Sequence, residues 1–362
     1  MNRCDPADHK VATYSLDTPR LRTRVLEAGA RSAPPVVLIH GNVSSARFFT
    51  NIMGELARRW RVLAFDMRGF GGSEAGPVDA TRGLRDFSDD LEACLGALDV
   101  LGSPLRLLGW SMGAGVALQY AIDHPGRVAS LVLESPMSPF GFGGTKDQRG
   151  TPCWEDFAGS GGGTANTDLV RRIVEQDRGD DGPTAPRNVL TQLYIKPANV
   201  LAPDEVEVLV GEILTTVIGE ANYPGDAVSS ANWPFLAPGV LGVLNAISPR
   251  YCDLSAFSEL PDHPEVLWIR GSDDQIVSDQ SMSDLGHLGE LGLVPGWPGA
   301  STFPAQPMVA QMRHLLERHR ANGGNYHELV LPDCGHSPHL ERPAAFIAAV
   351  LDFLAAAPRF RG

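Results

Sequence analysis

The sequence has no cluster of basic side chains. It carries 30 Lys and Arg residues against 43 Asp and Glu residues, which gives a formal net charge of −13 at pH 7. Nucleic acids and anionic membrane surfaces are bound through clustered Lys and Arg side chains. The composition therefore argues against a nucleic-acid partner and against an anionic membrane partner, and it favours a small, uncharged partner.

Long apolar runs are missing as well. No stretch approaches the ~20 apolar residues that a membrane-spanning helix needs. The first 17 residues are polar and lack the apolar core of a signal peptide. We therefore expect neither a membrane span nor a secretory signal.

Cysteine is scarce. The five cysteines are odd in number and show no CxxC spacing: Cys4, Cys94, Cys153, Cys252 and Cys334. Neither a disulfide framework nor a zinc site is indicated, and the histidines show no metal-ligand spacing. We expect a reducing, cytoplasmic environment and no metal or cofactor, and the sequence leaves a homodimer open.

The apolar pattern predicts alternating strands and helices. Two patches of apolar-polar alternation within residues 10–28 predict an antiparallel pair of strands. Continuous apolar runs typical of buried parallel strands lie at 35–39, 61–65, 105–108, 128–134, 265–270 and 327–331. Helical spacing lies at 45–59, 83–100, 308–321 and 343–356, and after the turn within 105–124. The alternation predicts an α/β fold with a parallel sheet and helices on both faces.

Two stretches interrupt this alternation, and both are rich in Gly and Pro. Residues 135–262 contain helical patches only at 166–178 and 203–219, and residues 279–307 contain no regular pattern. A stretch of the first length between two strands is too long for a loop and predicts an inserted module. We therefore divide the chain into a core of residues 1–134 and 263–362, an insertion of residues 135–262, and a lid-like excursion of residues 279–307.

A G-x-S-x-G pattern, Gly109-Trp110-Ser111-Met112-Gly113, joins the strand and helix within residues 105–124. Such a turn exposes the serine hydroxyl, and its glycines allow a close approach of neighbouring backbone. The following helix points its free amides at the space where an oxyanion would form. Because the pattern is also compatible with an ordinary strand-to-helix turn, partner residues must decide its meaning.

Two candidate partners follow other predicted strands. Asp274 lies just after residues 265–270, and His336 lies just after residues 327–331. The carboxyl ends of parallel strands share one edge of a sheet, so these side chains and Ser111 are expected to converge there. A serine needs an imidazole to take its proton, and the imidazole needs a carboxylate to orient it. The order Ser, Asp, His along the chain is that of the α/β-hydrolases.

The motifs together resemble the α/β-hydrolase family, of the single-chain kind with an inserted cap. They lie within residues 20–140 and 263–356, and they are His40-Gly41, the run from Asp66 to Ser73, the Ser111 turn, Gly271-Ser-Asp-Asp274, and Gly335-His336 with Glu341. The resemblance implies a mostly parallel eight-stranded sheet. It implies Ser111 as nucleophile, Asp274 as orienting acid and His336 as base, with the backbone amides of Asn42 and Met112 as oxyanion donors.

Several residues have alternative interpretations. Glu134 ends the strand after Ser111, where some family members place the triad acid, and it is the rival to Asp274. Asp273 is expected to form the turn, and His339 is expected at a helix entry or on the surface. His40 is expected to be a structural hydrogen-bonding residue beneath the oxyanion loop.

The resemblance also bounds the reaction. Family members with an aspartate at the turn open epoxides or displace halides, and Ser111 speaks against both. The remaining expectation is hydrolysis of a carboxylic ester or lactone of a small, largely apolar molecule. Alternatives within the fold are an amide hydrolase, a C–C bond hydrolase and a non-catalytic ligand receptor. The insertion offers candidates for a mostly apolar pocket lining, with the core of the insertion itself as the alternative position for each: Phe140, Phe142, Trp154, Trp233, Phe235 and Leu236.

Overall fold

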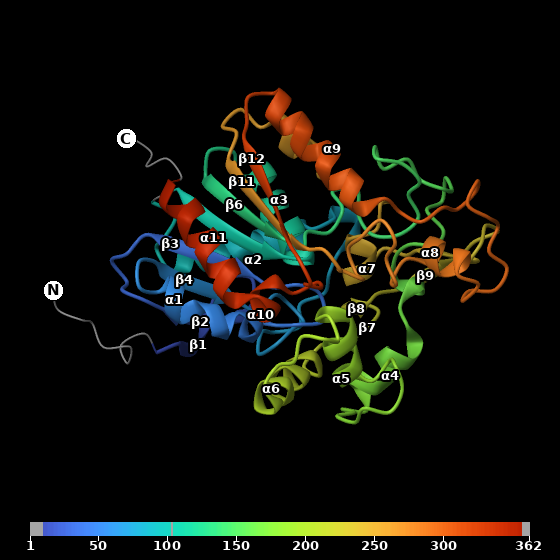
Figure 1. Cartoon of the computed structure of the whole chain (residues 1–362), viewed down its shortest axis with the longest axis horizontal. Helices are drawn as coiled ribbons and strands as arrows, with labels where there is room; N and C mark the ends of the chain where they lie inside the picture. The colour runs from blue at the N-terminus through green and yellow to red at the C-terminus, as the bar shows by residue number, and fades with distance from the viewer. Residues whose placement is uncertain (1–9, 103, 357–362) are drawn as a thin grey trace.

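An eight-stranded sheet forms the centre of the computed structural model, which describes residues 10–102 and 104–356 (Figure 1). The strand order is β1-β2-β4-β3-β5-β6-β11-β12. The strands are β1 (Ala12–Asp17), β2 (Arg22–Ala28), β3 (Pro35–Ile39), β4 (Arg61–Phe65), β5 (Leu105–Trp110), β6 (Val128–Glu134), β11 (Glu265–Gly271) and β12 (Tyr326–Leu331). Only the β1–β2 and β2–β4 pairings of this sheet are antiparallel. The predicted mostly parallel eight-stranded sheet is confirmed.

Helices cover both faces of the sheet. Figure 1 shows α11 (Pro343–Ala356) in front of the sheet and α3 (Met112–Asp123) behind it. α1 (Thr50–Leu56) is in contact with α11, and α2 (Arg85–Ala97) is in contact with α3. Every residue of β3, β4 and β6 is buried between these layers, which explains the unbroken apolar runs in their sequence.

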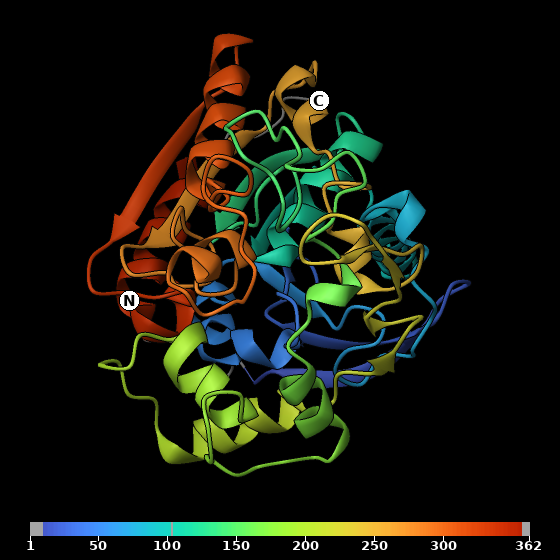
Figure 2. The same ribbon diagram turned by 90° about the vertical axis from the view of Figure 1, so that its right-hand side faces the viewer.

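The two interrupted stretches hold short elements. They are α4 (Thr167–Val174), α5 (Pro186–Val189), α6 (Pro203–Ile213), β7 (Ile218–Gly219), β8 (Tyr223–Pro224), β9 (Ala227–Ser229), β10 (Leu236–Pro238), α7 (Val243–Ala246) and α8 (Leu285–Glu290). A π-helical turn, η5 (Leu190–Tyr194), follows α5. Further short elements are η2 (Ala46–Phe49), η3 (Ala80–Arg82), η4 (Gly162–Thr164), η6 (Ser255–Glu259) and α10 (Pro338–Glu341), and the longer helix α9 (Met308–Ala321) precedes β12. Figures 1 and 2 show α4, α5, α6 and α8 on one side of the sheet.

The helix predicted over residues 203–219 is too long. α6 ends at Ile213, and two threonines follow it. The hydroxyls of Thr215 and Thr216 donate back to the carbonyls of Glu212 (2.6 Å) and Ile213 (2.8 Å), which satisfies the last turn. The Val217 amide then donates to a carbonyl of the core at 2.8 Å, so the chain leaves the helical path there.

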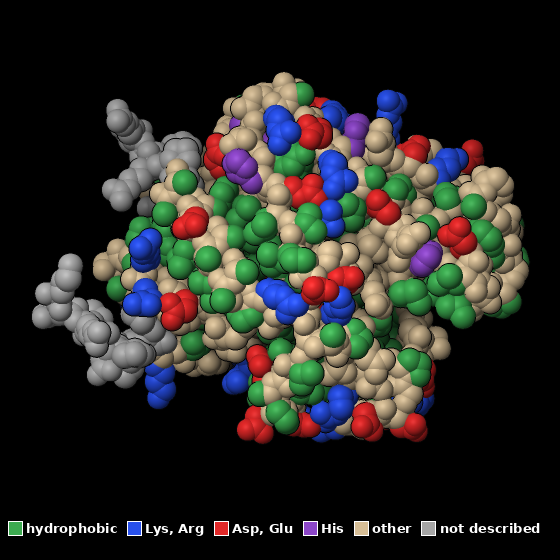
Figure 3. Space-filling model, in the orientation of Figure 1, with side chains coloured by type: hydrophobic (Ala, Val, Ile, Leu, Met, Phe, Trp, Pro, Cys, Tyr) green, Lys and Arg blue, Asp and Glu red, His purple; other side chains and the backbone are tan. Residues whose placement is uncertain are grey.

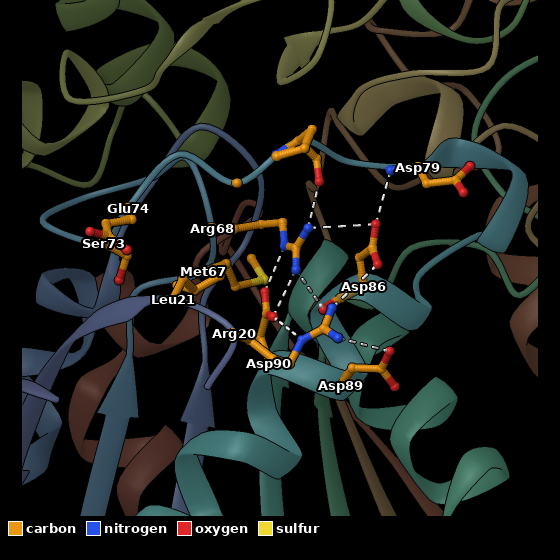
Figure 4. Close-up of polar contacts among 12 residues, drawn as sticks. Arg20, Leu21, Met67, Arg68, Ser73, Glu74, Asp79, Asp86, Asp89 and Asp90 are labelled. Carbon is orange, nitrogen blue, oxygen red and sulfur yellow. Dashed lines mark hydrogen bonds and ion pairs between the residues drawn. The ribbon is translucent and has the colours of Figure 1, made fainter. Parts of the chain in front are cut away.

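Buried ion pairs fix the loop after β4 to helix α2. Arg68 Nε and Nη2 donate to the two carboxylate oxygens of Asp90 at 2.6 and 2.7 Å (Figure 4). Arg20 Nε donates to the same carboxylate at 2.6 Å, and Asp86 lies 3.5 Å from Arg68 Nη1. The Arg68 side chain is 7% exposed. This network holds the glycine-rich loop of residues 66–73 against α2.

Charged side chains on the surface are mixed in sign. On the face shown in Figure 3, Lys and Arg side chains lie scattered among Asp and Glu side chains and form no single large patch. Across residues 10–102 and 104–356, no helix combines the length and the apolar character that crossing a membrane requires.

Candidate active site

Ser111 lies between β5 and α3 with φ 57° and ψ −120°, in the left-handed region that a serine seldom adopts. Its amide donates to the carbonyl of Glu134 at 2.8 Å. A Cβ atom at Gly109 would lie 2.4 Å from the Gly113 carbonyl oxygen, and one at Gly113 would lie 2.1 Å from the Ile39 carbonyl oxygen. Both glycines of the pattern are therefore required by close backbone contacts, and the turn has the strained geometry of a nucleophile elbow.

The Asp274 and His336 side chains are hydrogen-bonded. His336 Nδ1 donates to Asp274 Oδ2 at 2.9 Å, and the two side chains are 2% and 3% exposed. The other carboxylate oxygen of Asp274 accepts the amides of Ile276 (2.8 Å) and Val277 (2.9 Å). The carboxylate is thus held on both sides. The backbone of His336 is held as well, because Trp110 Nε1 donates to the His336 carbonyl at 2.9 Å. Nε2 is the ring nitrogen that the bond to Asp274 does not use.

Ser111 and His336 line the same cavity of about 520 Å³. Asn42 and Met112, the expected oxyanion donors, line it as well. The lining is mostly aliphatic and aromatic, and among the described lining residues none is Asp, Glu, Lys or Arg. Both interrupted stretches contribute, with Leu169 from α4 and Leu285 from α8 as examples. The cavity has the size and character of a small-molecule site.

The expected oxyanion loop follows β3 and lies against the elbow. A Cβ atom at Gly41 would be 3.1 Å from the Ser111 Cβ, so the loop backbone approaches the serine closely. His40 supports the loop from below: its Nε2 accepts the Met67 amide at 2.9 Å and its Nδ1 donates to the Gly41 carbonyl at 2.7 Å. Complete burial lowers the pKa of His40 to about 4, so the ring is neutral at pH 7. These bonds fit the structural role expected for His40.

Glu134 is hydrogen-bonded to His339 and not to His336, the histidine that a triad acid would orient. Its Oε1 accepts the ring Nδ1 of His339 at 2.7 Å and the His339 backbone amide at 2.8 Å. Both side chains are fully buried. Of the two positions expected for His339, the helix entry is correct, since it is the second residue of α10. It does not lie on the surface, because the pairing with Glu134 and the packing against Phe49 enclose it.

Asp273 lies beside Asp274 but points elsewhere. Its carboxylate accepts the Ser272 hydroxyl at 2.7 Å and lies 3.3 Å from Lys196 Nζ, with the side chain 43% exposed. The neighbouring hydroxyl and ammonium hold the pKa of Asp273 below its ordinary value. The structure brings Asp274, not Asp273, to His336.

Of the candidate pocket residues in the insertion, only some are brought to the cavity. Phe142 lines it. Trp233 instead packs edge-on against Phe303 with its indole nitrogen 3.0 Å from the Pro295 carbonyl, and Phe235 is 62% exposed. Trp233 therefore joins the two interrupted stretches behind the cavity wall.

Sequence reasoning missed Tyr194 and the contacts of Glu341. Tyr194 lines the cavity and packs against the rings of Trp110 and His336. Glu341 accepts the backbone amides of Gly335 and Ser337 on either side of His336, at 2.9 and 3.2 Å. The sequence motif included Glu341 but indicated no partner for it, and no pattern pointed to Tyr194.

The eight-stranded sheet with helices on both faces is the α/β-hydrolase fold. Residues 34–160 match the family model described as the alpha/beta hydrolase fold. Among solved structures, the chain is similar to an esterase from Rhodococcus sp. ECU1013, with a TM-score of 0.59, 18% identity, and coverage of 96% of this chain and 99% of that one. It is also similar to 2-hydroxy-6-oxo-6-phenylhexa-2,4-dienoate hydrolase from Rhodococcus sp. strain RHA1, with a TM-score of 0.59, 17% identity, and coverage of 96% and 100%.

Two curated relatives align with part of the chain. A 2-hydroxymuconate semialdehyde hydrolase from Pseudomonas sp. (strain CF600) is 40% identical over 116 residues, which is 31% of this chain and 39% of the relative. A probable 1-acylglycerol-3-phosphate O-acyltransferase from Oryza sativa subsp. japonica is 36% identical over 137 residues, which is 36% of this chain and 32% of the relative. The chain thus spans about a third of the length of these relatives. The α/β-hydrolase fold that the sequence motifs indicated is thus confirmed, and the family model matches residues 34–160.

Proposed function

We propose that the protein is a serine hydrolase that cleaves a neutral carboxylic ester or lactone through an acyl-enzyme. The observation that carries the proposal is the hydrogen-bonded Asp274–His336 pair at the same uncharged cavity as the strained Ser111. A serine at such a turn that shares a cavity with an oriented imidazole is the arrangement that nucleophilic acyl transfer needs.

In the proposed reaction, Ser111 Oγ attacks the ester carbonyl carbon while His336 Nε2 takes the hydroxyl proton. The Asn42 and Met112 amides donate to the developing oxyanion, and Met112 adds the positive end of the α3 dipole. His336 then protonates the departing alcohol oxygen, which leaves an ester on Ser111. Water, deprotonated by the same imidazole, attacks that ester, and His336 returns the proton to the departing Ser111 Oγ as the acid is released. Asp274 keeps the imidazole oriented and stabilises its charged form throughout.

The composition of the cavity lining supports a neutral substrate. A phosphate or carboxylate group, such as those in the names of the two curated relatives' substrates, is bound by Arg or Lys in an enclosed site. No Arg or Lys is present among the described residues that line this cavity. Burying an unpaired anion there would cost several kcal/mol. Neutral esters and lactones avoid that cost.

A fluorophosphonate probe tests the nucleophile. It should label the wild-type protein with one equivalent and leave Ser111→Ala unlabelled, and p-nitrophenyl esters of short acids should be hydrolysed only by the former. Labelling of Ser111→Ala would remove Ser111 from its role. Stoichiometric labelling without turnover of any ester, lactone or amide would favour a ligand receptor.

A further inference from the structure

Tyr194 brings the insertion into direct contact with the oxyanion loop. It ends the π-helical turn η5, and its side chain is buried. The Tyr194 hydroxyl donates to the Asn42 carbonyl at 2.9 Å and lies 3.3 Å from the Val43 carbonyl. One hydroxyl therefore contacts the carbonyls on both sides of Val43.

Val43 is strained. Its φ is 48°, in the left-handed region, where a β-branched side chain is a marked outlier. Such a conformation costs of the order of 1–3 kcal/mol and persists only where neighbouring groups fix it. Its amide is held by the Asn42 side chain at 3.0 Å, and its two flanking carbonyls are held by Tyr194.

The position of Tyr194 is fixed from the other side by the loop that carries His336. Ile195, the next residue, closes the π-helical turn with a 3.1 Å bond from its amide to the Leu190 carbonyl. The Lys196 amide then donates to Glu341 at 2.9 Å, and Glu341 also accepts the Gly335 amide at 2.9 Å. The Glu341 carboxylate thus ties the chain just after Tyr194 to the backbone just before His336.

We infer that Tyr194 is a positioning residue, through which the insertion holds the oxyanion loop in its strained, donor-presenting conformation. Without the hydroxyl, the Val43 backbone can relax toward an ordinary conformation, and the peptide planes around Asn42 turn with it. The amide expected to stabilise the oxyanion is then misdirected in the transition state. The inference rests on the proposed function of Ser111, and it makes the insertion part of the catalytic geometry as well as a cover for the cavity.

Tyr194→Phe isolates the hydroxyl, because the ring that lines the cavity stays. Loss of an oxyanion donor lowers kcat by about 10²–10³, and for a displaced donor we expect a fall of about 10- to 100-fold. The fall should be the same for p-nitrophenyl acetate, butyrate and octanoate, with KM changed by less than about twofold, since the donor acts mainly in the transition state. The rate of Ser111 phosphonylation by a small fluorophosphonate should fall by a similar factor.

Tyr326→Phe is the matched control. Tyr326 is also buried, and its hydroxyl donates to Glu317, but it lies in the edge strand β12, outside the cavity. This variant should match the wild type in both assays, and melting curves should show all variants folded. A change in KM or in chain-length preference with an unchanged phosphonylation rate would make Tyr194 only a cavity wall and overturn the inference.

Val43→Gly gives a second, independent readout. Glycine adopts a positive φ without strain, so the contacts of the Tyr194 hydroxyl with the Asn42 and Val43 carbonyls should matter less in the Val43→Gly background. The fall in kcat caused by Tyr194→Phe should shrink to about threefold or less when the substitution is made in the Val43→Gly protein. If the two substitutions lowered kcat independently, the inference that Tyr194 holds the strained Val43 backbone would be contradicted. Wild-type protein that no fluorophosphonate labels would overturn the proposed function and this inference together. Labelled wild type with an equally fast Tyr194→Phe would overturn the inference alone.

Discussion

Glu134 and His339 form a closed pair, in which one carboxylate oxygen accepts both the ring Nδ1 at 2.7 Å and the backbone amide at 2.8 Å of the same histidine. The pair lies directly beneath the elbow, since the Glu134 carbonyl accepts the Ser111 amide at 2.8 Å. A carboxylate so engaged is not placed to orient His336. The bonds to His339 therefore explain the buried Glu134 carboxylate without giving it the part of a triad acid.

Asp274→Asn should lower kcat by about 10⁴-fold, because an amide at this position no longer favours the His336 tautomer that accepts the serine proton. Glu134→Gln should keep most of the activity and lower the melting temperature, because it weakens a buried charge-assisted bond. Steady-state kinetics on one p-nitrophenyl ester and thermal unfolding of both variants check this. A greater loss of kcat in Glu134→Gln than in Asp274→Asn would transfer the acid to Glu134.

His40 should make the fold sensitive to acid. Its pKa is lowered by burial to about 4, against 6.5 in the unfolded chain, so the unfolded state binds more protons between these values. The contribution of the neutral His40 ring to the free energy of unfolding is fully present above pH 6.5. It is lost as the pH falls toward 4, and the loss amounts to about 3 kcal/mol in all. Urea unfolding from pH 7 to 4.5 should show this slope.

His40→Gln provides the comparison. It should be less stable at pH 7 and should show a shallower decline toward acid. The difference between the two proteins isolates His40 from His319, whose pKa is also lowered by burial. Parallel curves for wild type and variant would assign the acid sensitivity to other groups.

The sheet and the three proposed catalytic residues could be predicted because both leave local marks in the sequence. β3, β4 and β6 are buried at every residue, so each appears as an unbroken apolar run. Ser111, Asp274 and His336 each follow a strand, and the shared edge of a parallel sheet brings such positions together.

Contacts that join distant or patternless segments could not be predicted. Glu134 and His339 are 205 positions apart, and nothing near either residue indicates the other. Tyr194 bonds to backbone carbonyls, which every residue carries, so no side-chain pattern marks its partner. The end of α6 depended on threonine hydroxyls and on a bond from Val217 to the core, which helical periodicity cannot reveal.

Arg68→Ala should be strongly destabilising. Its guanidinium is 7% exposed and forms two bonds of 2.6 and 2.7 Å with Asp90, so the substitution leaves a buried carboxylate with less compensation. Breaking one partner of a buried pair costs about 3–5 kcal/mol. Arg22→Ala is the control, since the Arg22–Glu74 pair is 3.8 Å apart and more than half exposed, and it should cost at most about 1 kcal/mol. Equal urea unfolding midpoints for Arg68→Ala and Arg22→Ala would contradict the stabilising role of the Arg68–Asp90 pair.

Trp233→Ala should alter specificity without altering the reactivity of the serine. The indole nitrogen of Trp233 donates to the Pro295 carbonyl at 3.0 Å. Leu293 and Val294, which come just before Pro295 in the chain, line the cavity. Loss of the indole should let this wall move, because it also removes the edge-on packing against Phe303. We expect kcat/KM for octanoate esters to change by about tenfold relative to acetate esters, since a longer acyl chain makes more contacts with the wall.

Phe235→Ala is the control for the Trp233 experiment, because this neighbouring side chain is 62% exposed. It should leave the ratio of octanoate to acetate kcat/KM within about twofold of the wild type, as expected for a surface substitution. Phosphonylation of Ser111 by a small fluorophosphonate should proceed at the wild-type rate in both variants. If Trp233→Ala slowed phosphonylation as much as ester turnover, the residue would be supporting the catalytic geometry and not the shape of the cavity. If it changed neither, the contact between the two interrupted stretches would have no part in substrate selection.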